Sequence, residues 1–306
     1  MNHGGSAPGP VVVGVDGSAA ALEAVRWAAR DAARRHIPVR LVHAYTPAGL
    51  DYPSQQRSIT QMREQGGAWL HVAAIVAAEA APTVPVDTTL REGDPRVVLL
   101  DESRRAAVVV LSSRGLHGVS RLLLGSAGLA LAIHGRCPVV VVRGAIADGG
   151  PVVVGVDGWP ASAAAVQFAF QQASLHGTRL TAVRTWDEHT ALRARLGIGT
   201  AGSMAVHDEE RSTLIERVSG LATEFPDVPV DHIVVRGRPG RTLLEYGEHA
   251  RLIVVGARGR SGFAGLLLGS TSQAVAQHGP CPVAIVRPEV MRMPSLLDSR
   301  HHATGR

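Results

Sequence analysis

The sequence predicts an α/β protein built from two tandem copies of one domain, each a doubly wound, five-stranded parallel sheet flanked by helices. The first observation is an internal repeat. The peptide Val-Val-Val-Gly-Val-Asp-Gly occupies residues 11–17 and recurs at 152–158, and His-Gly-x-Cys-Pro-Val begins at both 134 and 278. The second observation is alternation. Within each copy, short apolar runs alternate with segments of helical spacing, which is typical of parallel βαβ units with right-handed crossovers.

The first copy shows how each element is predicted. Continuous apolar runs are typical of strands buried on both faces, and helices are indicated by apolar spacing of three or four residues. Ser18 is a plausible N-cap for the first helix. We expect strands at 11–15, 39–44, 86–90, 107–111 and 139–143, and helices at 19–35, 54–80 (interrupted or kinked near Gly66 and Gly67), 96–105 and 126–134.

The second copy repeats this pattern with a long polar insert around residues 187–205. We predict a first domain at residues 1–146 and a second at 151–290, joined through the small, glycine-rich segment 145–150. Residues 291–306 form a polar tail that is expected to be disordered.

Composition limits the class of protein. The 306-residue chain is 45% apolar and 19% charged, which is ordinary for a soluble globular protein. No apolar run approaches the roughly 20 residues of a membrane span, and the N-terminus lacks the features of a signal peptide. We therefore expect a cytoplasmic protein with no membrane partner. The two cysteines, Cys137 and Cys281, are expected to be buried free thiols.

The basic residues exclude several functions. The net charge is +5, but the basic residues are spread along the chain without a basic block, so we expect no nucleic-acid partner. All 31 basic residues are arginine. P-loop NTPases and protein kinases use a lysine on the phosphates, so the absence of lysine disfavours both, together with Schiff-base enzymes.

A glycine-marked loop follows the predicted fourth strand of copy two. Gly256, Gly259 and Gly269-Ser270 fit the spacing G-x2-G-x9-G-S between a buried strand and a helix. Glycines allow close approach of backbone to ligand, successive N–H groups form an anion nest, and a helix N-terminus favours phosphate. The candidate phosphate-binding residues are Gly256, Ala257, Arg258, Gly259, Arg260, Ser261, Gly262, Gly269, Ser270, Thr271 and Ser272.

On these motifs the chain resembles tandem universal stress proteins of the ATP-binding kind, over roughly residues 9 to 288. The resemblance rests on the Gly-Val-Asp-Gly strand end, the G-x2-G-x9-G-S loop and the closing Cys-Pro-Val strand. It implies a Rossmann-like fold of the adenine nucleotide alpha hydrolase-like type. It also implies ATP as the ligand, often with a divalent cation such as Mg²⁺. The resemblance further favours a homodimer of the whole chain.

The resemblance also assigns roles to residues. The nucleotide would lie across the ends of strands one and four. The glycine loop would contact the ribose and phosphates, and the Gly-Ser pair would bind the terminal phosphates. The adenine and ribose pocket would be lined by Gly14 and Asp16 in copy one and by Gly155 and Asp157 in copy two. The backbone at the end of strand two, at Ala44 and Thr185 to within one residue, would meet the adenine.

Copy one departs from the pattern at its first loop position. Its candidate residues are Ser112, Ser113, Arg114, Gly115, Leu116, His117, Gly118, Gly125, Ser126 and Ala127, with Ser112 where copy two has Gly256. If this position requires positive φ, serine costs about 1–3 kcal/mol. If it requires only close approach, serine can be accommodated and can bond the ribose.

Several candidates also have purely structural interpretations. Asp16 and Asp157 precede glycine and are typical of turns, and Ser18 fits a helix cap as well as it fits a ligand contact. His134 and His278 lie at predicted helix C-termini, where histidine bonds the last carbonyls. The edge run at 139–142 would be exposed unless covered. In the family that the chain resembles, the edge strands of two domains pair, so the resemblance implies that the two copies pair with each other through their fifth strands.

Three functions remain open at this point. The leading hypothesis is an ATP-binding regulator of stress response or growth arrest. The second is a slow ATPase or nucleotidyl-transfer relative, although the chain has no nucleophile elbow, zinc-protease motif or Cys/His metal cluster. The third is a nucleotide-free interaction module, against which the intact copy-two loop argues.

Overall fold

The computed structural model confirms the predicted α/β architecture and joins the two halves into one sheet. It describes residues 9–47, 53–113, 125–144, 149–157, 162–186, 203–258 and 268–290, and the side chains of 53–58 and 203–205 are not among those described. The ten strands follow the order β3-β2-β1-β4-β5-β10-β9-β6-β7-β8. Strand pairs within each half are parallel, as expected when helices connect successive strands.

The elements lie close to the predicted positions in both copies. Those of the first half are β1 (Val11–Gly14), α1 (Ala19–Arg35), β2 (Val39–Tyr45), α2 (Pro53–Ala80), β3 (Val86–Glu92), α3 (Pro95–Glu102), β4 (Val108–Ser112), α4 (Ser126–His134) and β5 (Val139–Val142). Those of the second half are β6 (Val152–Gly155), α5 (Ala163–Leu175), β7 (Leu180–Trp186), α7 (Ser203–Ala222), β8 (Val230–Arg236), α8 (Pro239–Gly247), β9 (Leu252–Gly256), α9 (Ser270–His278), β10 (Val283–Val286) and the short 3-10 helix η2 (Pro288–Val290).

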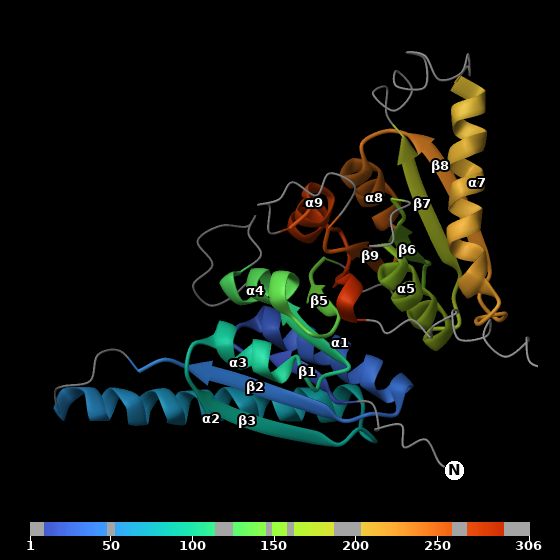
Figure 1. Cartoon of the computed structure of the whole chain (residues 1–306). Helices are drawn as coiled ribbons and strands as arrows, with labels where there is room; N and C mark the ends of the chain where they lie inside the picture. The colour runs from blue at the N-terminus through green and yellow to red at the C-terminus, as the bar shows by residue number, and fades with distance from the viewer. Residues whose placement is uncertain are drawn as a thin grey trace, which may run out of the picture.

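The two halves meet at the fifth strand of each. β5 and β10 pair antiparallel, with Val140 opposite Ala284, and Figure 1 shows the blue-to-green half joined there to the yellow-to-red half. This confirms the expected pairing between copies. The apolar run of β5 is fully buried and no longer forms a sheet edge.

The core is continuous on one face of the sheet. One cluster of buried side chains extends from β1 and α1 through β5 to β6 and α5, so it crosses the junction between the halves. On the other face, α3 and α4 cover a cluster in the first half, and α8 and α9 cover one in the second. The two copies therefore share a core on the α1 and α5 face of the sheet.

The predicted interruption of the second helix is wrong. α2 runs unbroken through Gly66 and Gly67, and Figure 1 shows it as one long helix. Gly66 is needed for packing, since a Cβ there would lie 2.5 Å from a ring carbon of His43 and 2.9 Å from Leu90. The glycine therefore lets the helix approach β2 and β3 closely.

The cysteines are buried and free, as expected. Burial raises the pKa of both the Cys137 and the Cys281 thiol to about 12, so neither forms an appreciable amount of thiolate at neutral pH. Among the described helices, none is long and apolar enough to span a bilayer.

Candidate nucleotide site

The candidate residues gather at the carboxyl edge of each parallel half. β1 lies between β2 and β4, with Val13 in register with both Leu41 and Val110. The ends that carry Asp16, Ala44 and Ser112 are therefore neighbours. β6 lies between β7 and β9 in the same way, which brings Asp157, Thr185 and Gly256 to one edge. Ligands bind at such switch points of open parallel sheets.

In copy two, both ends of the glycine loop are tied to the sheet. The Ser272 hydroxyl donates a hydrogen bond to the Gly256 carbonyl, which links the first turn of α9 to the end of β9. The backbone N–H of Gly269 donates to the Ala257 carbonyl at 2.9 Å, and the Ala257 N–H donates to Val286 at 2.8 Å. These bonds bring the helix N-terminus beside the strand end.

The N-terminus of α9 is suited to an anion. Its N-cap is Gly269, which has no side-chain oxygen to accept bonds from the first-turn N–H groups. Ser270 and Arg258 are exposed beside it, and Thr271 is half-buried. Phosphate binds at helix N-termini for this reason, because the free amides and the helix dipole both favour negative charge.

The side chains of two candidate residues in copy two are buried in the fold and do not face a ligand. Ser272 is 3% exposed with its hydroxyl bonded to Gly256, and Ala257 is also 3% exposed. They can meet a ligand only through their backbone. The predicted contacts at Gly259, Arg260, Ser261 and Gly262 lie outside the described residues.

Backbone strain at Ser112 is excluded as an obstacle in copy one. Among the described non-glycine residues, only His36 has positive φ, and the described glycines with positive φ do not include Gly256. The position therefore does not require glycine for its backbone conformation. Serine is accommodated there at no cost from strain.

The rest of the copy-one site follows copy two. α4 begins at Ser126 after the N-cap Gly125, both exposed, and Ala127 is half-buried. The Ser113 N–H donates to the Val142 carbonyl at 3.1 Å, as Ala257 does to Val286. The predicted contacts at Arg114, Gly115, Leu116, His117 and Gly118 lie outside the described residues.

Asp16 builds the turn that follows β1. Its Oδ1 accepts from the Ser18 backbone N–H at 3.0 Å and from the Ser18 hydroxyl at 2.7 Å. The Ser18 hydroxyl in turn accepts from the Ala21 N–H at 3.1 Å, so the cap interpretation of Ser18 is confirmed. Gly17 between them has a φ of 82° and packs against the ring of Trp69.

Gly14 and Gly155 have a packing role. A Cβ at Gly14 would lie 2.6 Å from a methyl of Leu111, and a Cβ at Gly155 would lie 2.9 Å from a methyl of Leu243. The side chains that the glycines admit come from β4 and α8. Close packing of these leucine side chains therefore favours glycine at the two strand ends, independently of a ligand.

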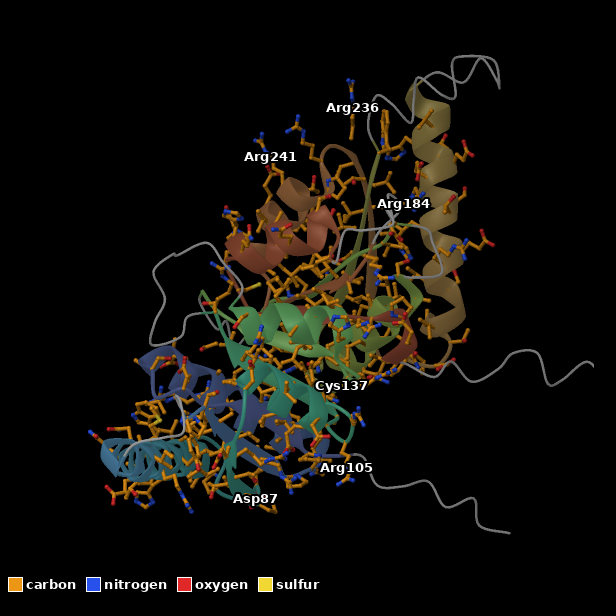
Figure 2. All side chains as sticks on the ribbon, turned by 60° about the vertical axis from the view of Figure 1, so that its left-hand side comes forward. Asp87, Arg105, Cys137, Arg184, Arg236 and Arg241 are labelled. Atoms are coloured by element: carbon orange, nitrogen blue, oxygen red, sulfur yellow. The ribbon has the colours of Figure 1, made fainter. Side chains whose placement is uncertain are left out.

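The two sites differ beside the second strand of each copy. Ala44 follows His43, whose Nδ1 lies 2.7 Å from the Val15 carbonyl and whose ring meets Trp69 edge-on. Thr185 follows Arg184, which forms a buried ion pair with Glu210 of α7. Figure 2 shows Arg184 beside α7, whereas Arg236 and Arg241 extend from the outer end of this half.

Charge also differs at the turn between the third strand and the following helix. In copy one, Asp94 caps α3, and hydrogen bonds from Arg96 lower the pKa of its carboxyl to about 2. In copy two, the matching N-cap of α8 is Arg238, which makes no side-chain cap bond. The carboxyl edge of copy two is therefore the more positive of the two at this turn.

Sequence reasoning missed two arginines. Arg143 and Arg287 follow β5 and β10, and each donates a hydrogen bond to a carbonyl of the other copy. The signal was present in the repeat, because both strands end in Val-Arg, but the partner carbonyls could not be known without the pairing of β5 with β10. His278 does bond the Ala274 carbonyl at 3.1 Å, as predicted for a helix C-terminus.

The family follows from comparison with known proteins. The pattern that defines the Universal stress protein family matches this chain twice, over residues 9–143 and 150–287. The chain belongs to the universal stress protein family. Both matches contain a complete set of strand ends and a glycine loop, so the resemblance to tandem universal stress proteins is confirmed.

Relatives share the tandem organisation along their whole length. A universal stress protein of Mycolicibacterium smegmatis is 38% identical over 91% of this chain and 97% of its own. Universal stress protein Rv2623 of Mycobacterium tuberculosis is 35% identical over 94% and 99%. A crystal structure of a universal stress protein from Archaeoglobus fulgidus superposes with a TM-score of 0.68 over 91% and 96%, at 18% identity, and so shares the fold.

Proposed function

We propose that this universal stress protein binds ATP, with a divalent cation such as Mg²⁺ on the phosphates, and acts as a nucleotide-dependent regulator of stress response or growth arrest. The observation that carries the proposal is the N-terminus of α9. Its first turn lacks a side-chain cap and is tied beside the end of β9 by the Ser272–Gly256 bond. Phosphate would bind the first-turn amides, and adenine would lie toward the ends of β6 and β7.

Regulation requires that ATP stabilise one state of the protein over another. A ligand shifts such an equilibrium only by its difference in affinity for the two states. The loop between β9 and α9 is the place where bound phosphate would act. Cytoplasmic location and a homodimer of the whole chain stay predictions of the sequence.

The test uses a charge at the two helix N-termini. Ser126 and Ser270 are exposed first residues of α4 and α9. Aspartate there stabilises a helix through its dipole, but it repels phosphate. We expect wild-type protein to bind two ATP per chain by titration calorimetry, and Ser126→Asp and Ser270→Asp each to bind one. Ser126→Asn and Ser270→Asn are the neutral controls of matched size and should retain binding.

Two results would contradict the proposal. The first is wild-type protein that carries no nucleotide after purification and shows no thermal stabilisation by millimolar ATP. The second is equal loss of binding in the aspartate and asparagine variants. ATP turnover that disappears in Asp157→Ala while the fold survives would instead favour the slow ATPase.

A further inference from the structure

The junction between the copies has approximate twofold symmetry. β5 and β10 run antiparallel about the pair Val140 and Ala284. Each strand is followed directly by an arginine, Arg143 or Arg287. Because the strands run in opposite directions, each arginine reaches the helix that covers the other copy.

Both arginines donate to carbonyls at a helix C-terminus of the other copy, although the two carbonyls are not at equivalent positions of the repeat. Arg143 donates from Nη1 to the carbonyl of Ala276, at 2.5 Å, in the last turn of α9. Arg287 donates from Nη1 to the carbonyl of Gly135, the C-cap residue of α4, at 3.1 Å. A guanidinium at a helix C-terminus bonds carbonyls that the helix leaves unpaired and meets the negative end of its dipole.

The backbone holds Arg143 firmly against its target. The next residue, Gly144, has a φ of 63°, and a Cβ there would lie 1.8 Å from the carbonyl oxygen of Pro280 in the other copy. The backbones of the two copies are therefore in close contact at this point, and Arg143 lies beside the end of α9. Arg287 is steadied differently, by an ion pair with Glu289 at 3.3 Å.

The helices held in this way are the ones that face the candidate phosphates. α4 and α9 are nine residues each, with Ser126 and Ser270 at one end and the arginine at the other. A helix of that length is about 13 Å long, and its ladder of backbone hydrogen bonds couples its two ends. A shift at its C-terminus is therefore transmitted to the amides at its N-terminus.

We propose that Arg143 and Arg287 are positioning residues that act across the copies: Arg143 of the first half orients the nucleotide site of the second, and Arg287 of the second half orients that of the first. The inference rests on the proposed function. It follows that the affinity of each site depends on the other copy. The tandem arrangement then strengthens binding and does not only double its capacity.

The test isolates one site at a time. Ser126→Asp leaves the copy-two site, and Ser270→Asp leaves the copy-one site. Arg143→Gln is expected to weaken ATP binding about fivefold or more when the copy-two site is isolated, and to have a clearly smaller effect at the isolated copy-one site. Arg287→Gln should show the reverse preference. Arg143→Lys should fall between arginine and glutamine, since one ammonium can still donate to one carbonyl.

Arg179→Gln is the matched control. Arg179 forms an exposed ion pair with Asp231 just before β7, at the amino end of that strand, and should affect neither site. A merely structural role for Arg143 would weaken both sites together or neither. Either result would overturn the inference.

Hydrogen exchange separates this inference from the proposed function. Without any nucleotide, backbone amides of α9 should exchange faster in Arg143→Gln, and those of α4 faster in Arg287→Gln. If wild-type protein binds no ATP but exchange changes in this crossed pattern, the proposed ligand is wrong and the cross-copy positioning stands. If exchange rises equally in both helices for each variant, the positioning itself is wrong.

Discussion

At the residue scale, the two copies exchange serine and glycine at two matching positions of the candidate site. In copy two, the strand end is Gly256 and the helix supplies the Ser272 hydroxyl that bonds to it. In copy one, the strand end is Ser112 and the helix position that matches Ser272 is the buried Gly128. Each copy thus has one serine and one glycine at the base of its loop. The serine is at the strand end in copy one and in the helix in copy two. The departure of copy one from the G-x2-G-x9-G-S spacing is matched by a second departure on the facing element.

The variant Ser112→Gly tests, through the sign of its effect on stability, whether the backbone at Ser112 is strained. Ser112 does not have positive φ, so no strain is released by glycine. Glycine instead loses more backbone freedom on folding, and we expect the free energy of unfolding to fall by about 0.5–1 kcal/mol. Urea denaturation at constant m-value measures the change. Stabilisation by 1 kcal/mol or more would mean that Ser112 is strained after all.

At the level of elements, the sequence predicts what depends on local pattern. The helices Ala19–Arg35 and Ser126–His134 begin and end at the predicted residues, because a cap or glycine and a regular apolar face define each of them. The break near Gly66 was predicted wrongly, since helix propensity alone does not reveal that His43 and Leu90 pack against that glycine.

The candidate site was predictable only in part, because some of its contacts join elements that are distant in sequence. Strand ends and glycine spacing place Asp157, Gly256 and Ser270 at one edge before any coordinates are known. The Arg184–Glu210 ion pair and the bond from Arg143 to Ala276 depend on how elements distant in sequence meet. No local pattern encodes that register, so these residues could be found only in the structure.

The C-terminus of α5 carries a histidine that makes stability depend on pH. Burial, and then the charges of Arg251, Arg34 and Arg35, lower the pKa of His176 to about 3. His176 is thus neutral in the folded protein at pH 5, whereas an unfolded histidine with a pKa near 6.5 is protonated. The unfolded state binds more protons between about pH 6.5 and pH 3, so stability falls as pH falls through this range.

We expect the free energy of unfolding to drop by up to about 2 kcal/mol between pH 7 and pH 5 on account of His176 alone. The variant His176→Gln should lose much less over the same interval, because glutamine does not titrate. Denaturant titrations of both proteins at the two pH values measure the difference. Parallel pH dependence in the two proteins would show that His176 is not the group responsible.

On the scale of the whole molecule, a buried polar cluster joins α1 to α5 across the two copies. Arg35 donates from Nε to Asp31 at 2.6 Å, and its guanidinium lies 5.8 Å from the ring centre of Phe168. Gln172, with its amide oriented to suit both, donates to Asp31 at 3.3 Å and accepts from Arg35. Asp31 and Gln172 are almost fully buried, at 1% and 0% exposed. The cluster therefore holds the first half against the second through polar groups that are mostly shielded from water.

Removing Asp31 should weaken the whole molecule. Asp31→Ala leaves the Arg35 guanidinium, whose side chain is 14% exposed, without its carboxylate, and breaking a buried pair in this way costs about 3–5 kcal/mol. The matched control is Asp87→Ala, which breaks the Arg40–Asp87 pair, where the side chains are 40% and 58% exposed. That pair is screened by water and should contribute less than about 1 kcal/mol. Because the cluster spans both copies, the larger loss should appear in hydrogen exchange of α1 and α5 alike. Equal costs for the two variants, or a loss confined to α1, would mean that the halves are held together by their apolar core and the β5–β10 pairing without a contribution from this cluster.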